Sequence, residues 1–245
     1  LFNLAEGDAA GAARDKTSDS LLTRAARLLF EGIIFGLIIG LCAIGLSLIY
    51  GTTGLVNFAL SEQIVFGALV AYFFNAILGI NLIGAALIAF VVGGLGSAFL
   101  DVGLWRPLRK RGTGLTAMMI ISIGLALFLR FFFLFLFGER SRPYDQYAVQ
   151  TDILFSVGPV DVLPKELLII VVGSLLLFGT AFGLRATKMG KAMRAVADNR
   201  ELAESSGIDV EKVINWVWVS GAALAALGGV FFGLDQVKWD FGFRT

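Results

Sequence analysis

Four polar residues stand close together inside an otherwise apolar region and could contact a polar solute. They follow the sequence Gly51-Thr52-Thr53-Gly54, which we expect to break a helix, and they are Asn57, Ser61, Glu62 and Gln63. Glu62 is the single formal charge between residues 32 and 100, and an ionisable group at membrane depth is a functional candidate. Half-helix ends direct their partial charges into transporter cavities. These residues are therefore candidates for a substrate path, although hydrogen bonds to neighbouring helices, with Glu62 near an interface, explain them equally well.

The sequence lacks the groups that most enzymes use. It contains no histidine, and its one cysteine, Cys42, lies inside an apolar segment. It has no GxxxxGK[ST] loop to hold nucleotide phosphates, and no paired carboxylates within the apolar segments. The net charge of +1 gives no electrostatic reason to expect nucleic acid as a partner. We therefore expect no catalytic residue, no metal site and no cofactor in this chain.

A polar segment at 185–213 has the pattern of a helical hairpin. Apolar residues recur at i, i+3, i+4 and i+7 of a first helix, at Met189, Ala192, Met193 and Val196. The basic residues fall on a different side, at Lys188, Lys191 and Arg194. An apolar stripe on a short helix between two strongly apolar segments suits a groove on a cytosolic partner protein, with small residues at Gly190, Ala195 and Ala197 for close approach.

A second short helix is expected directly after the first. Asp198 is expected to cap it, and Glu201, three residues later, would complete a capping box. Gly207 stands where a left-handed residue would end it.

The elements that must position these residues are membrane spans. Apolar residues make up 57% of the chain and charged residues 16%, against roughly 45–50% and 25% in soluble domains. Apolar segments of about 20 residues, the length that crosses a bilayer, lie at roughly 30–50, 60–79, 82–104, 115–137, 165–184 and 213–234. The fold class is therefore all-α: a polytopic transmembrane bundle at 30–245 with a broken second helix and a helical hairpin at 185–212. Residues 1–29 form a polar tail in which Asp19 or Ser20 could cap an interfacial helix.

Basic residues in short loops predict the orientation. Loops 105–114 and 185–212 are rich in lysine and arginine and are separated by two spans, so both are assigned to the cytoplasm. Loop 138–164 is one span away from each of these two loops, and the N-terminal tail is three spans away from the first of them. Both segments are therefore assigned to the outside. Pro107 is expected to end the third span, with the basic residues around it on lipid headgroups. Trp216 and Trp218 are expected in an aromatic belt.

The hairpin resembles the coupling loop of ABC-importer permeases. The residues that carry the resemblance are KMGKAMRAVADN at 188–199, Leu202-Ala203 and Ser206-Gly207-Ile208. Two further matches lie upstream in the family's order, GLSLIYG at 45–51 with GLVNFA at 54–59, and RPLR at 106–109. Together they are most similar to the branched-chain amino acid permease family. The chain departs from that family at Leu60-Ser61, where relatives commonly have His-Gly.

The resemblance implies partners and site residues. It implies two cytoplasmic ABC ATPase subunits, which would hold ATP and Mg²⁺, a second permease subunit or copy, and an extracytoplasmic solute-binding protein. The residues expected to couple to the ATPase are Met189, Gly190, Lys191, Met193, Arg194, Ala197, Asp198, Leu202 and Gly207. The family's permeases continue with further spans after the position of Leu234, so we expect C-terminal spans beyond this sequence.

The resulting prediction is a permease subunit of an ABC importer in the bacterial inner membrane. Its solute would be a branched-chain or related amino acid, with urea or short amides as alternatives. An ion- or proton-coupled carrier that uses Glu62 is the rival, and it would transport without any ATPase. A membrane-embedded enzyme is disfavoured because the spans lack a recognisable catalytic set.

Overall fold

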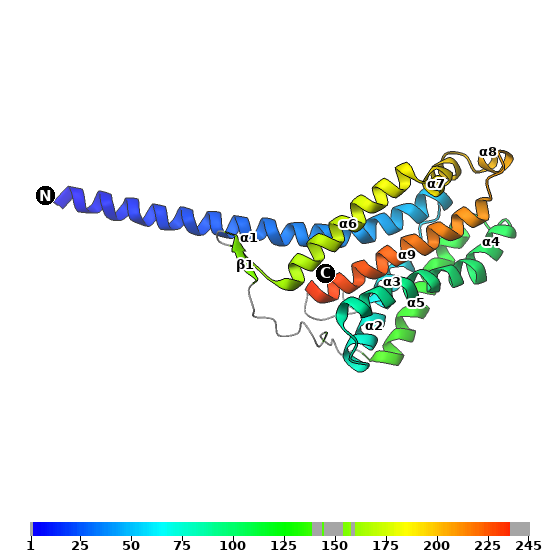
Figure 1. Cartoon of the computed structure of the whole chain (residues 1–245), viewed down its shortest axis with the longest axis horizontal. Helices are drawn as coiled ribbons and strands as arrows, with labels where there is room; N and C mark the ends of the chain where they lie inside the picture. The colour runs from blue at the N-terminus through cyan, green and yellow to red at the C-terminus, as the bar shows by residue number, and fades with distance from the viewer. Residues whose placement is uncertain (1, 139–143, 145–153, 158–159, 236–245) are drawn as a thin grey trace.

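The computed structural model describes residues 2–138, 144, 154–157 and 160–235. It is an all-α bundle, as the sequence predicted, with one short antiparallel hairpin of strands in the segment after the fourth span (Figure 1). The helices and strands in chain order are α1 (Phe2–Thr53), α2 (Leu60–Tyr72), the π-helical turn η1 (Phe73–Ile77), α3 (Leu82–Leu100), the π-helical turn η2 (Asp101–Trp105), α4 (Arg106–Lys110), α5 (Leu115–Phe137), β1 (Phe155–Val157), β2 (Val160–Val162), α6 (Pro164–Ala186), α7 (Lys188–Asp198), α8 (Arg200–Ser205) and α9 (Val210–Asp235).

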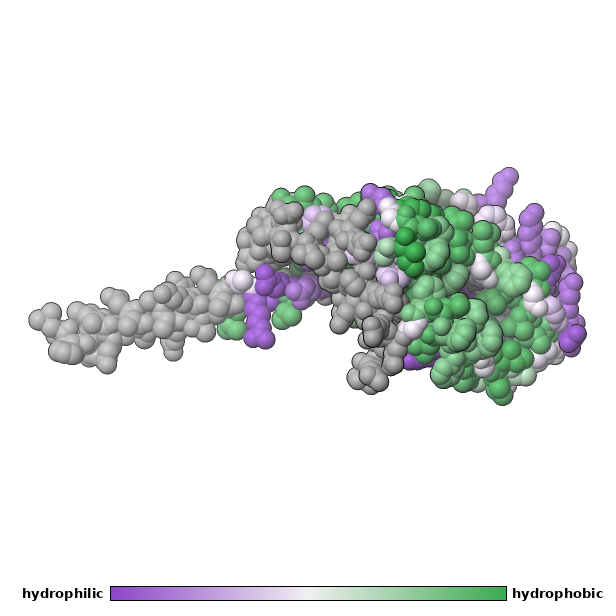
Figure 2. Space-filling model, turned by 90° about the horizontal axis from the view of Figure 1, so that it is seen from below, coloured by the Kyte–Doolittle hydropathy of each residue, from purple (hydrophilic) through white to green (hydrophobic). Residues whose placement is uncertain are grey.

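Within the described part of the chain, six helical stretches are long and apolar enough to cross a membrane. They run over Leu21–Thr53, Leu60–Ile77, Leu82–Lys110, Leu115–Phe137, Pro164–Ala186 and Val210–Asp235. Each contains, to within two residues, one of the spans expected from hydropathy. Figure 2 shows apolar surface over the bundle and hydrophilic residues gathered at the end where Figure 1 places α4, α7 and α8.

Helix α9 lies at the centre of the bundle, and α1, α2 and α3 pack around it. In its most apolar stretch 83% of the residues are buried, against 11% for α5 and α6, which lie at the periphery. Its sequence from 221 to 231 is mostly glycine and alanine, and every residue of that stretch is buried. Small side chains let membrane helices approach closely, so that dispersion contacts replace the hydrophobic effect between them.

Two glycine contacts illustrate how closely α9 is approached by its neighbours. A Cβ atom at Gly45 of α1 would collide with the carbonyl oxygen of Gly221 on α9. A Cβ atom at Gly67 of α2 would collide with the backbone of Ala226, also on α9. No side chain fits at either position without moving a helix.

The break between the first two spans is shorter than expected. Helix α1 continues through Gly51 to Thr53, so the expectation that Gly51 begins the break is wrong. The hydroxyls of Thr52 and Thr53 donate to the carbonyls of Leu48 and Ile49, as threonine does in a helix. The helix ends at Gly54, whose φ of 67° is left-handed, and residues 54–59 are not helical. Helix α1 also runs without interruption through Asp19 and Ser20, so neither residue caps a helix.

Pro107 does not end the third span, which corrects a second expectation. The backbone widens into η2, where the Arg106 N–H bonds back to the carbonyl of Asp101, and α4 then carries Pro107 in its first turn. Proline is tolerated there because a first-turn residue needs no backbone donor. The span ends instead at Lys110, followed by Gly112 with a φ of 70°.

Two stacked indole rings lie where the π-helical turn η2 packs against α9. Trp105 and Trp218 are both fully buried, and their rings stack with centroids 5.6 Å apart. Trp218 is therefore a core residue and not part of an aromatic belt, because α9 turns it inward against η2. Trp216, two residues earlier, is half exposed and remains a candidate for the belt.

Candidate functional site

The hairpin expected at 185–212 is formed by α7 and α8. Thr187 caps α7, and its hydroxyl oxygen accepts the Gly190 N–H at 3.0 Å. Asn199 caps α8, and its side-chain oxygen accepts the Leu202 N–H at 2.9 Å. The expectation that Asp198 is this cap is wrong by one residue, because α7 runs one residue further and Asp198 is its last helical residue.

Gly207 ends α8 with a φ of 82°, as its position predicted. Its N–H bonds to the carbonyl of Glu204, and the Ile208 N–H bonds to the carbonyl of Ala203. These two bonds form a Schellman motif, and they satisfy carbonyls that the end of the helix would otherwise leave unpaired. The hairpin therefore has defined ends at each of its helices.

The apolar stripe of α7 faces the bundle and not the surrounding solvent. Met193 and Val196 are 8% and 3% exposed and belong to the same buried cluster as Trp105, Val213 and Trp218. A Cβ atom at Gly190 would lie 2.5 Å from Leu184 of α6, so this glycine allows contact within the chain. The expectation that the stripe is offered to a groove on a partner is therefore wrong, because the stripe fixes α7 to its own spans.

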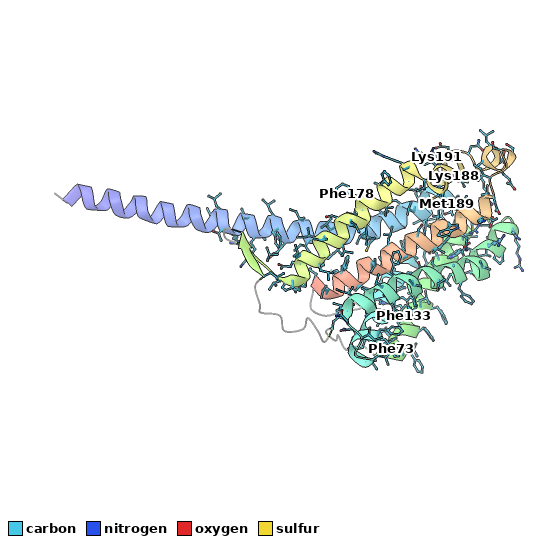
Figure 3. The ribbon with its side chains drawn as sticks, viewed as in Figure 1. Phe73, Phe133, Phe178, Lys188, Met189 and Lys191 are labelled. Carbon is cyan, nitrogen blue, oxygen red and sulfur yellow. The ribbon has the colours of Figure 1, made fainter. Side chains whose placement is uncertain are left out.

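The opposite face of the hairpin is exposed. It carries Lys188 and Lys191, which Figure 3 places on α7 at the outer corner of the bundle. Arg194 of α7 is also exposed, and Leu202 of α8 is 64% exposed. The residues of this exposed face that the sequence assigned to coupling are Lys191, Arg194, Ala197, Asp198, Leu202 and Gly207. Their contact with an ATPase stays a prediction.

An ion-pair network, buried at Asp101 and Arg109 and more exposed at Arg200, joins the hairpin to the spans. Arg109 of α4 donates to Asp101 at 2.7 Å and to Glu211 of α9 at 3.1 Å. Glu211 also accepts from Arg200 of α8 at 2.8 Å and pairs with Arg106 at 3.4 Å. These contacts show that loops 105–114 and 185–212 lie at one end of the bundle, as their basic residues predicted.

The sequence pattern did not identify this network. Arg109 was expected on lipid headgroups, but its side chain is 8% exposed and that of Asp101 is fully buried. Asn215 of α9 adds a hydrogen bond to the second oxygen of Asp101 at 3.3 Å. One signal was present in the sequence: Asp101 and Arg109 are eight residues apart, so an uninterrupted helix would place them on similar faces.

Two of the four substrate-path candidates lie together in a pocket between α2, α3 and α5. Glu62 and Gln63, 7% and 5% exposed, line a cavity of about 270 Å³. Ser97 of α3, which the sequence gave no reason to single out, lines it beside them and is 1% exposed. The large apolar residues of its lining are Phe66, Phe99, Leu100, Leu129, Phe132 and Phe133.

The other two candidates lie outside this pocket. Asn57 is buried in the non-helical segment, where its side-chain oxygen accepts the Ala59 N–H at 3.1 Å and shapes the turn into α2. Ser61 is exposed, and its hydroxyl donates to the carbonyl of Phe58 at 2.8 Å. Ser61 therefore has a local structural role and does not face the pocket.

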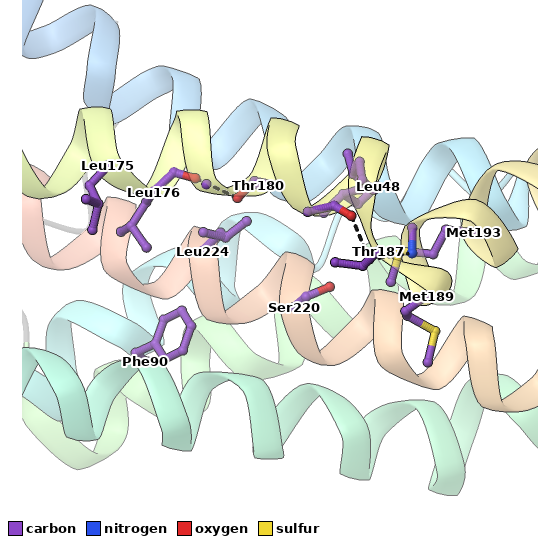
Figure 4. Close-up of a pocket in the computed structure, with 14 residues that line it drawn as sticks. Leu48, Phe90, Leu175, Leu176, Thr180, Thr187, Met189, Met193, Ser220 and Leu224 are labelled. Carbon is purple, nitrogen blue, oxygen red and sulfur yellow. Dashed lines mark hydrogen bonds between the residues drawn. The ribbon is translucent and has the colours of Figure 1, made fainter.

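A larger pocket of about 440 Å³ lies between the hairpin and the spans, and it is lined by residues of α1, α3, α6, α7 and α9 (Figure 4). Its hydroxyl groups belong to Thr180, Thr187 and Ser220, and each donates to a carbonyl of its own helix. The remaining lining is mainly leucine, methionine and phenylalanine. The described lining of this pocket is mainly apolar and its three hydroxyls already use their hydrogens within the chain, so it is a weaker candidate for binding a polar solute than the pocket at Glu62.

Comparison with known proteins agrees with this architecture. Residues 28–245 match the family described as "Branched-chain amino acid transport system / permease component". The high-affinity branched-chain amino acid transport system permease protein LivH of Salmonella typhimurium is 29% identical over 220 residues, which are 84% of this chain and 69% of that protein. The probable LivH permease of Methanocaldococcus jannaschii is 32% identical over 83% of this chain and 65% of its own length. The BraD permease of Pseudomonas aeruginosa is 28% identical over 84% and 70%.

No solved structure shows significant similarity to the chain. The family match nevertheless covers all six candidate spans except the first residues of the first one, together with the hairpin and the polar pocket. The chain therefore belongs to the family of permease components of branched-chain amino acid transport systems.

Proposed function

We propose that this chain is the membrane permease subunit of an ABC importer that takes up a branched-chain amino acid or a close relative. The family match and the names of the relatives support transport by an ABC permease. The six candidate spans found among the described residues make the chain a multi-pass protein, placed in the inner membrane. The partners in this proposal are two cytoplasmic ATPases carrying ATP and Mg²⁺, a second permease subunit or copy, and an extracytoplasmic solute-binding protein.

The observation that carries the proposal is how the hairpin is fixed. Its inner face packs on α6 and α9, and Glu211 bonds Arg200 of α8 to Arg109 at the end of the third span. Its outer face, with Lys191, Arg194 and Leu202, is exposed. A partner that pushed on the outer face would therefore move α9, the central helix, together with the end of the third span.

Reconstitution tests this function directly. The chain would be purified with the subunits that accompany it, placed in liposomes, and supplied with the solute-binding protein and radiolabelled leucine. We expect uptake only when ATP and Mg²⁺ are present on the side of the ATPases, with isoleucine and valine competing and urea not competing. Uptake by the chain without ATPases, driven by a proton or sodium gradient, would refute the importer and favour a carrier that uses Glu62.

A further inference from the structure

The pocket between α2, α3 and α5 contains polar atoms that have no hydrogen-bond partner among the described residues. The atoms without a partner are Nε2 and Oε1 of Gln63, the Ser97 hydroxyl and Oε2 of Glu62. Buried polar groups in folded proteins are nearly always bonded, and each exception requires an explanation. These four atoms come from two neighbouring helices and belong to residues that line the same cavity, whereas the other unbonded buried atoms of the described residues, in Asn57, Trp105, Arg106, Arg109 and Trp218, lie outside it.

The rest of the pocket lining is aromatic and aliphatic. Phe66 and Phe133 stack with centroids 5.7 Å apart, and the other large apolar residues of the lining are Phe99, Leu100, Leu129 and Phe132. Gly93 and Gly96 of α3 also line the pocket; a Cβ atom at Gly96 would contact the ring of Phe66, whereas one at Gly93 would meet Ala226 of α9. The lining of the pocket therefore combines a carboxylate, a carboxamide and a hydroxyl with large apolar side chains.

The size and chemistry of the pocket restrict what can occupy it. Its volume of about 270 Å³ is below the range of roughly 300–1,000 Å³ that is usual for drug-sized ligands, so the occupant is small. A lipid chain would match the phenylalanines but would leave the Glu62, Gln63 and Ser97 atoms unbonded in a medium without water. An occupant with a hydrogen-bond donor, an acceptor and an aliphatic part would bond to the polar atoms and also contact the apolar residues of the lining.

We propose that this pocket binds the transported solute during its passage, and that the solute is a small zwitterion with an aliphatic side chain. Glu62 accepts hydrogen bonds from the ammonium group of the solute. The Gln63 amide and the Ser97 hydroxyl donate to its carboxylate, and the side chain lies against Phe132 and Phe133. This inference rests on the proposed importer function and adds that the permease itself, and not only a binding protein, contacts the solute.

The test uses the intact complex of permease and ATPases in nanodiscs, without any solute-binding protein. Binding of radiolabelled leucine would be measured for the wild type, Gln63→Leu, Ser97→Ala and Glu62→Gln. We expect at least about tenfold weaker binding in each variant, because Gln63→Leu and Ser97→Ala each lose a hydrogen bond to the solute and Glu62→Gln loses the charge that faces its ammonium group. The matched control is Ser61→Ala, which removes a hydroxyl two residues from Gln63 but outside the pocket, and we expect its binding to be unchanged.

A labelling measurement covers the case in which a variant is poorly folded. In a Cys42→Ser background, Ser97→Cys would be reacted with a maleimide in the presence and absence of saturating leucine. Protection by leucine of at least about threefold, and none by glutamate, is the expected result. Equal leucine binding in all variants together with unprotected labelling would overturn the proposed pocket.

The two proposals fail in different ways. If the wild-type complex shows ATP-dependent leucine uptake but the pocket variants bind leucine normally, the pocket is wrong and the importer function stands. If the wild-type complex shows no ATP-dependent uptake at all, the importer function fails, and the pocket proposal fails with it.

Discussion

Arg109 of α4 and Glu211 of α9 form an ion pair of 3.1 Å, although 102 residues separate them in the chain. The pair joins the end of the third span to the start of the last one. Through Arg200 it also reaches α8 of the hairpin. The carboxylate of Glu211 therefore links the end of the third span, the start of α9 and the hairpin, which must move together if a partner pushes on the hairpin.

Removal of Asp101 should destabilise this end of the bundle. The Asp101 side chain is fully buried, so Asp101→Ala leaves the buried charge of Arg109 with Glu211 as its remaining partner. Breaking a buried pair costs about 3–5 kcal/mol, and we expect a clearly lower thermal midpoint in detergent. The Arg200 side chain is 46% exposed, and Arg200→Ala should cost no more than about 1 kcal/mol. Equal midpoints for the two variants would show that the buried network does not stabilise the fold.

The two faces of α7 should respond differently to a bulky residue. Ala197 is exposed, so Ala197→Trp should leave the fold intact while abolishing ATPase retention and leucine uptake. Gly190 contacts the backbone of α6, so Gly190→Trp should displace the hairpin and lower the thermal midpoint as well. Retention and uptake would be measured by co-purification and in liposomes. If Ala197→Trp retains the ATPases as well as the wild type does, the exposed face of α7 is not part of the surface that contacts the ATPases.

Close packing of α2 on α9 should not tolerate a methyl group. We expect Gly67→Ala to lower the thermal midpoint by an amount that corresponds to about 1–3 kcal/mol, because the new Cβ meets backbone and not a flexible side chain. Gly36→Ala is the matched control, since nothing lies within 4 Å of a Cβ atom at Gly36. If both variants have the same thermal midpoint, the close approach of α2 and α9 is not required for the stability of the fold.

Cysteine accessibility should report the orientation of the bundle. In a Cys42→Ser background, Ser205→Cys on α8 should react with an impermeant maleimide only when the cytoplasmic side is open. Leu78→Cys, in the turn between α2 and α3 and 54% exposed, should react from the outside. Labelling of sealed spheroplasts and of inverted vesicles distinguishes the two sides. The reverse pattern would overturn the assignment based on basic loop residues.

The sequence alone was sufficient to predict the spans, the helical hairpin and the glycine that ends the hairpin's second helix. Hydropathy located the helices because a bilayer requires about 20 apolar residues and full backbone hydrogen bonding within each span. The left-handed Gly207 was predictable because only glycine adopts that conformation freely. The clustering of basic residues correctly placed the two loops at one end of the bundle.

Tertiary structure alone decided which way the side chains face. Periodicity located the stripe on α7 but could not say whether it packs on the chain's own spans or on a partner, because both would bury the same residues. Asp101, Arg109 and Glu211 lie far apart in the chain or across a π-helical turn, so their pairing depended on how α4 and α9 meet. Ser97 was one small residue in a long apolar run, and only the packing of α3 against α2 placed it beside Glu62 and Gln63.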